Sequence, residues 1–424
     1  MKSMAHIKLL LAALTIVGGS AMTLSAQTQH GWRGPLRDGI YPDKGLLKVW
    51  PEAGPQLLWE TVEIGKGYSS PTIVGNRLYI TGMNEDETQE TFSAFTTDGK
   101  LLYTVAYGTP WKESYPETRT TPTIVGDKAY VTTGNGTVVC LNTADGSTVW
   151  KVDGVAVFGR KTGRWGISEG PLVFDNKVIF CPGGDMTTVV ALDAATGKTV
   201  WKSPTRHEPT NYTSPLLINH NGKKQIVTIT GKAVIGVNVD TGAIEWAFDN
   251  WGRPTEGQMS EKISPNTPIY HNGCIFFSEG YDMGSHLLQL NNDGTAVTAK
   301  WSNPDLDTHV GGYVLVDGVF YGSGWKGNNA GNWMAVDEKT GKSLYDTAWT
   351  GKSKGAIIYA DGMLYLYEER RGTVALVRAT PEKLDVISEF RITKGEGPHW
   401  AHPVIDNGVL YVRHGSFMGA YKIK

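Results

Sequence analysis

The stretch Val190-Ala191-Leu192-Asp193-Ala194-Ala195-Thr196-Gly197-Lys198-Thr199-Val200-Trp201 decides the fold of this chain. An apolar run leads into Asp193, a Thr-Gly pair follows, and a second run ends in tryptophan. The aspartate side chain can accept hydrogen bonds from its own turn, and glycine tolerates the left-handed conformation that closes it. The stretch therefore predicts two strands joined by a tight turn, with a terminal tryptophan that packs on a neighbouring unit.

This pattern returns in register along the chain. Further copies end at Trp150, Trp246 and Tyr345, whereas the copies near Leu290 and Ala379 are degenerate. A motif that recurs at a fixed interval indicates a repeat architecture, in which each unit buries its apolar faces against its neighbours.

A second pattern alternates with the first and consists of an apolar strand, a two-residue turn and another apolar strand. The clearest copy is Ser70–Ile80, with the turn at Gly75-Asn76. Eight copies begin at or near Pro71, Pro122, Pro171, Pro215, Pro268, Tyr313, Ala356 and Pro403. Turns of Gly, Asn and Asp favour hairpins, and the spacing of roughly 43 to 53 residues is typical of four-stranded propeller blades.

The last copy, Pro403–Lys424, ends after three strands. The missing fourth strand, with its aromatic residue, is present at the other end of the chain as Pro55–Glu60. Pairing the two would close a ring and remove its open sheet edges, which argues against an open solenoid. We therefore predict an all-β, eight-bladed β-propeller of four-stranded antiparallel blades over residues 55–424, closed by an N-terminal strand.

Residues 1–26 are predicted to be a signal peptide. Lys2 and Lys8 precede or begin an apolar run, and the end at Leu24–Gln27 is typical of a cleavage site after Ala26. An uncleaved anchor is the alternative, but the run is shorter than the roughly 20 residues of a membrane span. We expect a periplasmic or secreted protein with no lipidation cysteine, no transmembrane segment in the mature chain, and a lead-in segment at 27–54.

The net charge of −2 and the absence of long Lys or Arg runs give no sign of nucleic-acid binding. Three distant cysteines, Cys140, Cys181 and Cys274, are expected to be small buried hydrophobes, although one disulfide pairing stays open. We expect a monomer with an unknown small-molecule or envelope-protein partner and no nucleic acid.

The repeated Ala-x-Asp-x-x-Thr-Gly-x-x-x-Trp pattern resembles the tryptophan-docking motif of the PQQ-like (quinoprotein-type) propeller family. The segment from Trp32-Arg33-Gly34-Pro35 to Trp50-Pro51 looks like the start of secreted bacterial PQQ-like repeat proteins. The resemblance implies one of two functions. Some members are dehydrogenases that bind pyrroloquinoline quinone (PQQ) and calcium and oxidise alcohols or sugars, and others are BamB-type scaffolds that bind proteins.

This sequence departs from both kinds of relative. It has no adjacent cysteine pair and no C-x-x-C-H haem motif, which many quinoprotein dehydrogenases carry, and no lipobox of the BamB type. No local motif identifies a calcium ligand or catalytic aspartate. The sequence thus favours a ligand- or protein-binding module at the axial mouth. A dehydrogenase with PQQ and calcium is the first alternative and a carbohydrate-active enzyme the second.

The residues just before each innermost strand are expected to gather at one mouth of the ring. The candidates are Lys66, Tyr68, Arg119, Trp165, Glu169, Asn211, Tyr212, Lys262, Asn266, His309, Lys354, His399, Trp400 and His402. Such a cluster of rings, cations, amides and imidazoles is richer in polar chemistry than a purely structural ring needs.

Each type of candidate has its own expected role. The rings Trp165, Tyr212 and Trp400 are expected to stack a flat or sugar-like ligand, and the cations to meet carboxylates. Glu169 is a candidate metal ligand or base, with a pKa expected to be lowered by neighbouring cations. The histidines are candidates for proton transfer or metal binding, and the alternative for every one of these residues is a structural role.

Overall fold

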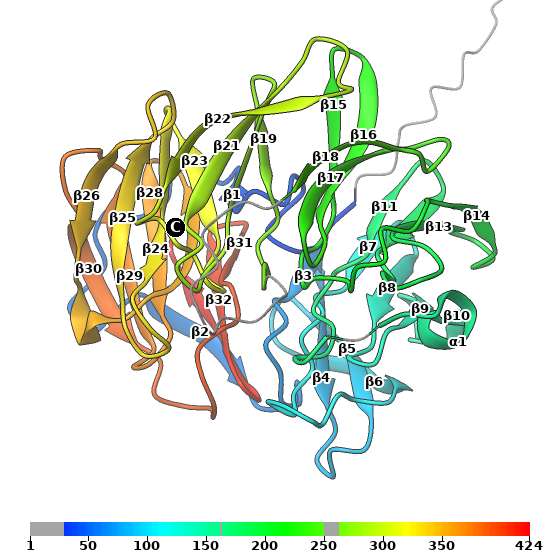
Figure 1. Cartoon of the computed structure of the whole chain (residues 1–424). Coiled ribbons are helices and arrows are strands. Elements are labelled where there is room, and N and C mark those ends of the chain that lie inside the picture. Colours follow the sequence, from blue (N-terminus) through cyan, green and yellow to red (C-terminus); the bar gives the residue numbers. More distant parts are fainter. Residues whose placement is uncertain (1–28, 162, 250–262) are drawn as a thin grey trace, which may run out of the picture.

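The structure is a computed structural model that describes residues 29–161, 163–249 and 263–424. Its strands form eight sheets, which succeed one another around the molecule in chain order (Figure 1). We number these sheets as blades 1 to 8, beginning with the one that starts at Thr72. The predicted all-β, eight-bladed propeller of antiparallel four-stranded blades is confirmed.

Blade 1 consists of β3 (Thr72–Val74), β4 (Arg77–Met83), β5 (Glu90–Thr96) and β6 (Leu101–Gly108), and blade 2 of β7 (Thr123–Val125), β8 (Lys128–Thr132), β9 (Thr137–Asn142) and β10 (Thr148–Asp153). Blade 3 consists of β11 (Leu172–Phe174), β12 (Lys177–Phe180), β13 (Val190–Asp193) and β14 (Thr199–Lys202), and blade 4 of β15 (Leu216–His220), β16 (Lys223–Ile229), β17 (Ala233–Asn238) and β18 (Ile244–Asp249). The predicted two-residue turns between first and second strands have positive φ, for example +49° at Asn272 and +75° at Gly273.

Blade 5 consists of β19 (Ile269–His271), β20 (Cys274–Ser278), β21 (Ser285–Leu290) and β22 (Val297–Asn303), and blade 6 of β23 (Tyr313–Val316), β24 (Val319–Trp325), β25 (Gly331–Asp337) and β26 (Ser343–Thr347). Blade 7 consists of β27 (Gly355–Ala360), β28 (Met363–Glu368), β29 (Thr373–Arg378) and β30 (Asp385–Arg391), and blade 8 of β31 (Val404–Asp406), β32 (Val409–His414), β33 (Phe417–Lys422) and β2 (Gln56–Thr61). The last blade is the closure that the sequence predicts, because β2 pairs antiparallel with β33.

Tryptophans join successive blades, as the repeat predicts. Trp150 of blade 2 donates through Nε1 to the carbonyl of Ala194 in blade 3 at 3.0 Å, and its ring covers Gly197. The closing strand uses the same joint, because Trp59 donates to Thr97 O in blade 1 at 2.9 Å. Buried apolar clusters accordingly lie between adjacent sheets, as for Tyr130 and Val178.

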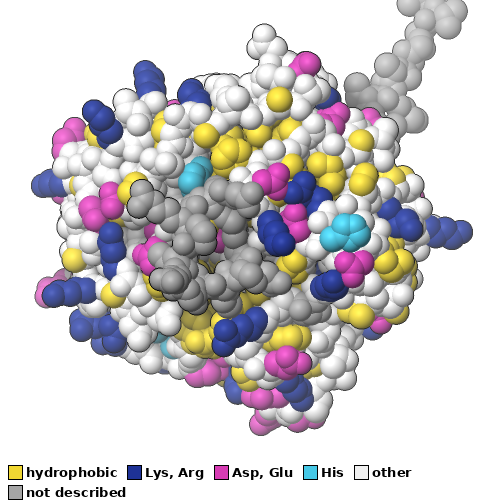
Figure 2. Space-filling model, viewed as in Figure 1, with side chains coloured by type: hydrophobic (Ala, Val, Ile, Leu, Met, Phe, Trp, Pro, Cys, Tyr) yellow, Lys and Arg dark blue, Asp and Glu magenta, His cyan; other side chains and the backbone are white. Residues whose placement is uncertain are grey.

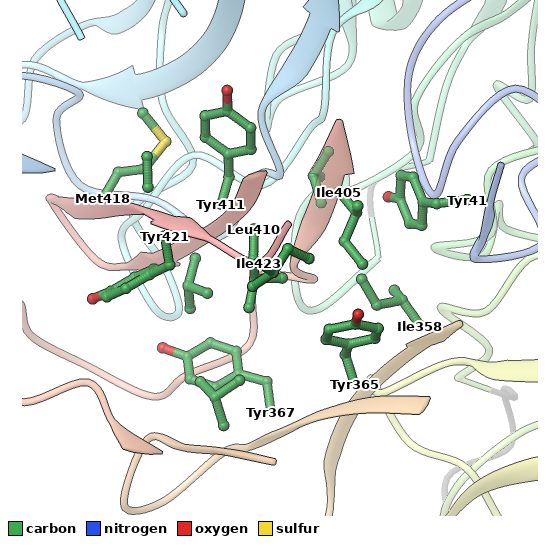
Figure 3. Packing of buried hydrophobic residues seen from close by; sticks show 14 of the residues in the cluster. Tyr41, Ile358, Tyr365, Tyr367, Ile405, Leu410, Tyr411, Met418, Tyr421 and Ile423 are labelled. Carbon is green, nitrogen blue, oxygen red and sulfur yellow. The ribbon is translucent and has the colours of Figure 1, made fainter. Parts of the chain in front are cut away.

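The lead-in segment packs against blades 7 and 8. Its short strand β1 (Ile40–Tyr41) runs parallel to β27 and makes blade 7 five-stranded. Tyr41 lies among Ile358, Tyr365 and Ile405, which come from both blades (Figure 3). Leu46 and Trp50 belong to the same cluster, so part of the lead-in segment belongs to the hydrophobic core.

Two short helices occur among the described residues, and the sequence predicted neither of them. They are α1 (Gly154–Phe158) and the 3₁₀ turn η1 (Thr350–Lys352). Asp153 caps α1 by accepting from the backbone N–H groups of Val155 and Ala156, a typical N-cap. Within the described ranges, no helix has the length and apolar character that crossing a membrane requires.

The three cysteines are buried and carry free thiols. Burial therefore agrees with the sequence-based expectation, and the open question of one pairing is answered by the free state of all three. Lys and Arg side chains lie scattered among acidic ones on the face that Figure 2 shows, in keeping with the near-neutral net charge of −2.

Candidate functional site

The segments that precede the inner strands are joined around the ring by hydrogen bonds. Blade 1 joins blade 2 where Ser70 N donates to Thr121 Oγ1 at 2.9 Å. Blade 8 is joined to blade 1 because Ser70 Oγ donates to His402 O, also at 2.9 Å. Similar bonds link the segments between, such as Gly170 N to Ser214 Oγ. We call the end of the ring at which the inner strands begin the axial mouth.

Four rings at the axial mouth form one continuous series of contacts, which we call the aromatic array. Tyr68 and Trp400 have ring centroids 5.0 Å apart, Trp400 and Tyr115 4.9 Å, and Tyr115 and Trp165 6.0 Å. Tyr115 is 47% exposed, and both tryptophans are half-buried. Three of these rings were predicted. Tyr115 was missed because it lies in the loop after β6, eight residues ahead of β7.

A buried ion pair orients Trp400. Lys354 Nζ lies 2.6 Å from Glu369 Oε1, and both side chains are almost fully buried. The other carboxylate oxygen of Glu369 accepts from Trp400 Nε1 at 3.2 Å. Lys354 also donates to the carbonyls of Gly327 and Asn328, so its charge is satisfied within the protein. Glu369 was missed because it follows β28, a second strand, rather than preceding an inner one.

Glu169 lies beneath the mouth rather than in it. Its side chain is fully buried, 3.5 Å from Arg160 Nη2, and accepts from the backbone N–H of Cys181 at 2.9 Å. Burial raises the pKa of Glu169, although Arg160 and Arg37 act in the opposite direction. The expectation of a lowered pKa was therefore wrong, because desolvation outweighs the nearby cations.

His402 is also buried, and both of its ring nitrogens are bonded. Arg33 Nη1 lies 2.8 Å from Nδ1, and Val310 O lies 2.8 Å from Nε2. Because a guanidinium can only donate, Nδ1 accepts and the proton is assigned to Nε2. Burial and Arg33 lower the pKa of His402 to about 3, so the ring is neutral.

The other two predicted histidines also have lowered pKa values. Burial lowers the pKa of His309 to about 3, with a further contribution from Lys354, and Tyr281 Oη lies 3.1 Å from its Nε2. His399 stacks on His414 with centroids 3.6 Å apart, and burial lowers its pKa to about 4. Tyr281 is a further mouth residue that the sequence did not indicate.

The remaining predicted residues hold loops in place or lie at the rim. Arg119 donates to the carbonyls of Ser114 and Tyr115 and so fixes the loop that carries Tyr115. The amides of Asn211 and Asn266 bond backbone groups, Tyr212 Oη accepts from Trp165 N, and Lys66 pairs with Glu87. Lys262 lies outside the described residues.

Several buried polar atoms at the mouth have no hydrogen-bond partner in the described part of the chain. They include Arg119 Nη1, Trp165 Nε1, His309 Nδ1 and Glu117 Oε2. Buried polar groups are rarely left unsatisfied in native proteins. These four atoms give the mouth hydrogen-bonding capacity that the protein itself does not use.

The donor set of the mouth does not fit a calcium centre. In residues 29–161, 163–249 and 263–424, no three His, Cys, Asp or Glu side chains are grouped as metal ligands. Calcium takes six to eight oxygen ligands, usually with several carboxylates. Here Glu369 is paired with Lys354 and Glu169 with Arg160.

A sequence profile of the family described as "Outer membrane protein assembly factor BamB" matches residues 93–347. This match spans more than half of the 424 residues. The chain belongs to this family. The predicted relation to PQQ-like and BamB-type repeats is thereby confirmed. A comparison with curated protein sequences gives no match.

Solved structures share the fold at low sequence identity. BamB from Moraxella catarrhalis is 14% identical with a TM-score of 0.63, and the alignment covers 87% of this chain and 99% of that one. Quinohemoprotein alcohol dehydrogenase from Comamonas testosteroni is 13% identical, with a TM-score of 0.67 and coverage of 93% and 80%. A europium-containing methanol dehydrogenase is 13% identical, with a TM-score of 0.61 and coverage of 91% and 90%. These likenesses establish the fold alone.

Proposed function

We propose that this BamB-family propeller is a binding module of the bacterial periplasm or exterior, with its ligand held at the axial mouth. The observation that carries the proposal is the aromatic array, which four rings from separate loops build across blades 8, 1, 2 and 3. Exposed rings supply large contact area at a low entropic cost, and they are enriched in binding sites. Signal-peptide-like residues 1–26 support the proposed location.

The ligand is a small molecule or a segment of an envelope protein, and we expect the propeller to act as a monomer. Most of the ionisable side chains at the mouth are already engaged within the protein, as the Lys354–Glu369 pair shows. Rigid, internally satisfied supports beneath half-buried rings suit recognition, because they keep the rings in one orientation when the ligand binds.

Two enzymatic alternatives have weaker support. A dehydrogenase that uses PQQ with calcium is favoured by the shared fold, but the described carboxylates do not form a calcium site. A glycoside hydrolase normally needs two carboxylates facing one bond. At this mouth, Glu369 is bound to Lys354 and to Trp400, which favours a role in orienting Trp400 over one in catalysis.

Photo-crosslinking from within the mouth tests the proposal. A benzoylphenylalanine replaces Tyr115, which is 47% exposed in the aromatic array, and in a matched variant it replaces Leu36, which is 72% exposed on the lead-in segment. Each full-length variant is irradiated in its native host and analysed by intact-protein mass spectrometry. We expect an adduct from position 115 alone, reduced at least about fivefold when Trp400→Ala removes a ring contact.

The mass of the adduct separates the two ligand classes, since a protein segment adds kilodaltons and a small molecule adds far less. The absence of an adduct at position 115 would contradict the proposal. Equal adducts from positions 115 and 36 would contradict it as well, because they would indicate contact with no preference for the mouth.

A further inference from the structure

The lead-in segment crosses the axis of the ring and contacts inner strands on opposite sides. We propose that residues 29–44 are a tethered peptide ligand, and that the inner wall of the ring is a binding site for a segment that folds into turns and carries two arginines four positions apart. The proposal does not depend on what binds at the axial mouth.

Main-chain pairing holds both ends of this segment. His30 and Ile124 of blade 2 exchange backbone hydrogen bonds of 2.9 and 2.8 Å. On the other side of the ring, Tyr359 N donates to Gly39 O at 2.9 Å, and β1 continues as a parallel partner of β27. Addition of a strand to a free sheet edge is a recognised mode of peptide binding. Here the edges belong to inner strands, and the peptide belongs to the same chain.

Arg37 makes the segment's side-chain contacts with blades 2 to 4. Its guanidinium donates to the backbone carbonyls of Gly170, Pro171 and Pro215 at 3.0, 2.6 and 3.0 Å. A longer contact of 3.5 Å reaches Thr123 Oγ1. The side chain is 2% exposed, so three blades converge on one buried cation.

Arg33 repeats this arrangement for blades 6 to 8. It donates to Tyr313 O at 2.5 Å and to Ile357 O at 3.1 Å, and it bonds His402 Nδ1 at 2.8 Å. The side chain is 3% exposed. The two arginines therefore divide six of the eight blades between them.

The chemistry of these contacts specifies arginine. Backbone carbonyls and one imidazole bond the two guanidinium groups directly. The carboxylates of Asp38 and Glu169 add favourable electrostatic interactions with Arg33 and Arg37, respectively. Burying a charge requires such compensation. A planar guanidinium with five donors can bond several carbonyls at once, whereas an ammonium cannot reproduce that fork.

An exposed stretch connects the segment to the rest of the fold. Leu36, between the two arginines, is exposed, and the chain is exposed again at Lys44-Gly45 after β1. A cut between Lys44 and Gly45 leaves the core residues Leu46 and Trp50 attached to the ring, whereas Tyr41 of the same cluster stays with the peptide. Such a cut breaks no main-chain pairing between the ring and residues 30–41.

Peptide exchange into the cut protein tests the proposal. A protease site is inserted between Lys44 and Gly45 of the full chain, which is folded first and cut afterwards. Fluorescently labelled peptide of residues 29–44 is then added, and its uptake is measured by anisotropy and size-exclusion chromatography. We expect uptake of one peptide per ring as the native fragment leaves. The Arg33→Ala/Arg37→Ala peptide should bind at least about a hundredfold more weakly, whereas the Leu36→Ala peptide should bind like the native sequence.

Three outcomes would overturn the proposal. The ring could unfold on cutting, as judged by circular dichroism. The fragment could neither leave nor exchange, in which case the segment is an inseparable part of the core. The double-arginine variant peptide could also bind as tightly as the native one, in which case the guanidinium contacts do not provide recognition.

Discussion

Glu90 links the stability of this propeller to pH. It begins β5, is 1% exposed, and accepts from the backbone N–H of Gly134 in blade 2 at 2.9 Å. Burial raises the pKa of Glu90 to about 7, against the opposing effects of Tyr107, Gly134 and Arg119. The folded state thus holds a proton that the unfolded chain releases near its ordinary value of 4.5.

A group whose pKa rises on folding stabilises the fold fully below its unfolded value, and this contribution is lost as pH rises through the folded value. The free energy of unfolding should therefore fall between about pH 4.5 and pH 7.5. Glu90→Gln, which stays neutral, should remove up to about 3 kcal/mol of that decline. The variant should match the native protein at pH 5 and exceed it at pH 8 in urea denaturation. Glu113→Gln, at an exposed position, is the control, and identical pH slopes for native protein and Glu90→Gln would contradict the account.

For single residues, the sequence indicates which side chains approach the mouth. It does not indicate which groups each of them contacts. Lys354 and Glu369 are 15 positions apart, and their pairing depends on the hairpin that returns from β27 to β28. The sequence predicts a lowered pKa for Glu169 because it places Lys and Arg residues at equivalent positions of other blades. Its complete burial, which reverses the direction of the pKa shift, follows only from tertiary packing.

Adjacent blades are joined where a tryptophan of one blade packs over a turn glycine of the next. Trp201 of blade 3 donates to Val239 O at 3.0 Å and covers Gly242 of blade 4. Gly242 has a φ of +75°, and a Cβ at that position would lie 2.5 Å from Cε3 of Trp201. Only glycine satisfies both the turn and the ring above it.

Gly242→Ala should accordingly lower the free energy of unfolding by about 3 kcal/mol, because left-handed strain and a steric clash with Trp201 combine. Gly222→Ala is a matched control: its φ is +87°, and nothing lies within 4 Å of the added Cβ. That variant should lose only about 1 kcal/mol from backbone strain. Equal losses in thermal or urea unfolding would show that the ring contact contributes nothing.

The repeat pattern identified these joints wherever the Thr-Gly turn was intact. It missed the joint of blade 5, where Trp301 donates to Glu338 O at 2.8 Å, because the turn near Leu290 reads Asn-Asn-Asp-Gly-Thr and lacks the motif. The joint persists because the packing of Trp301 on Gly341 depends on the neighbouring blade, whose own turn is regular.

For the whole molecule, ring closure was predictable and the course of the lead-in segment was not. Closure follows from a count of strands, since a last blade with three strands needs a fourth. The contacts of Arg33 with Ile357 and His402 span more than 300 residues. No local pattern encodes them, because they arise only when blades 6 to 8 and the lead-in segment come together in the folded ring.

We propose that this propeller binds its ligand at the axial mouth without quinone chemistry. The measurement that tests it most directly is titration of the purified full-length protein with PQQ, with and without calcium. Tryptophan quenching is followed, as is dye-linked oxidation of ethanol and glucose, and Trp400→Phe serves as the comparison. The account predicts no calcium-dependent quenching and no turnover above buffer. Saturable, calcium-dependent quenching that is weakened in Trp400→Phe and accompanied by substrate oxidation would contradict it.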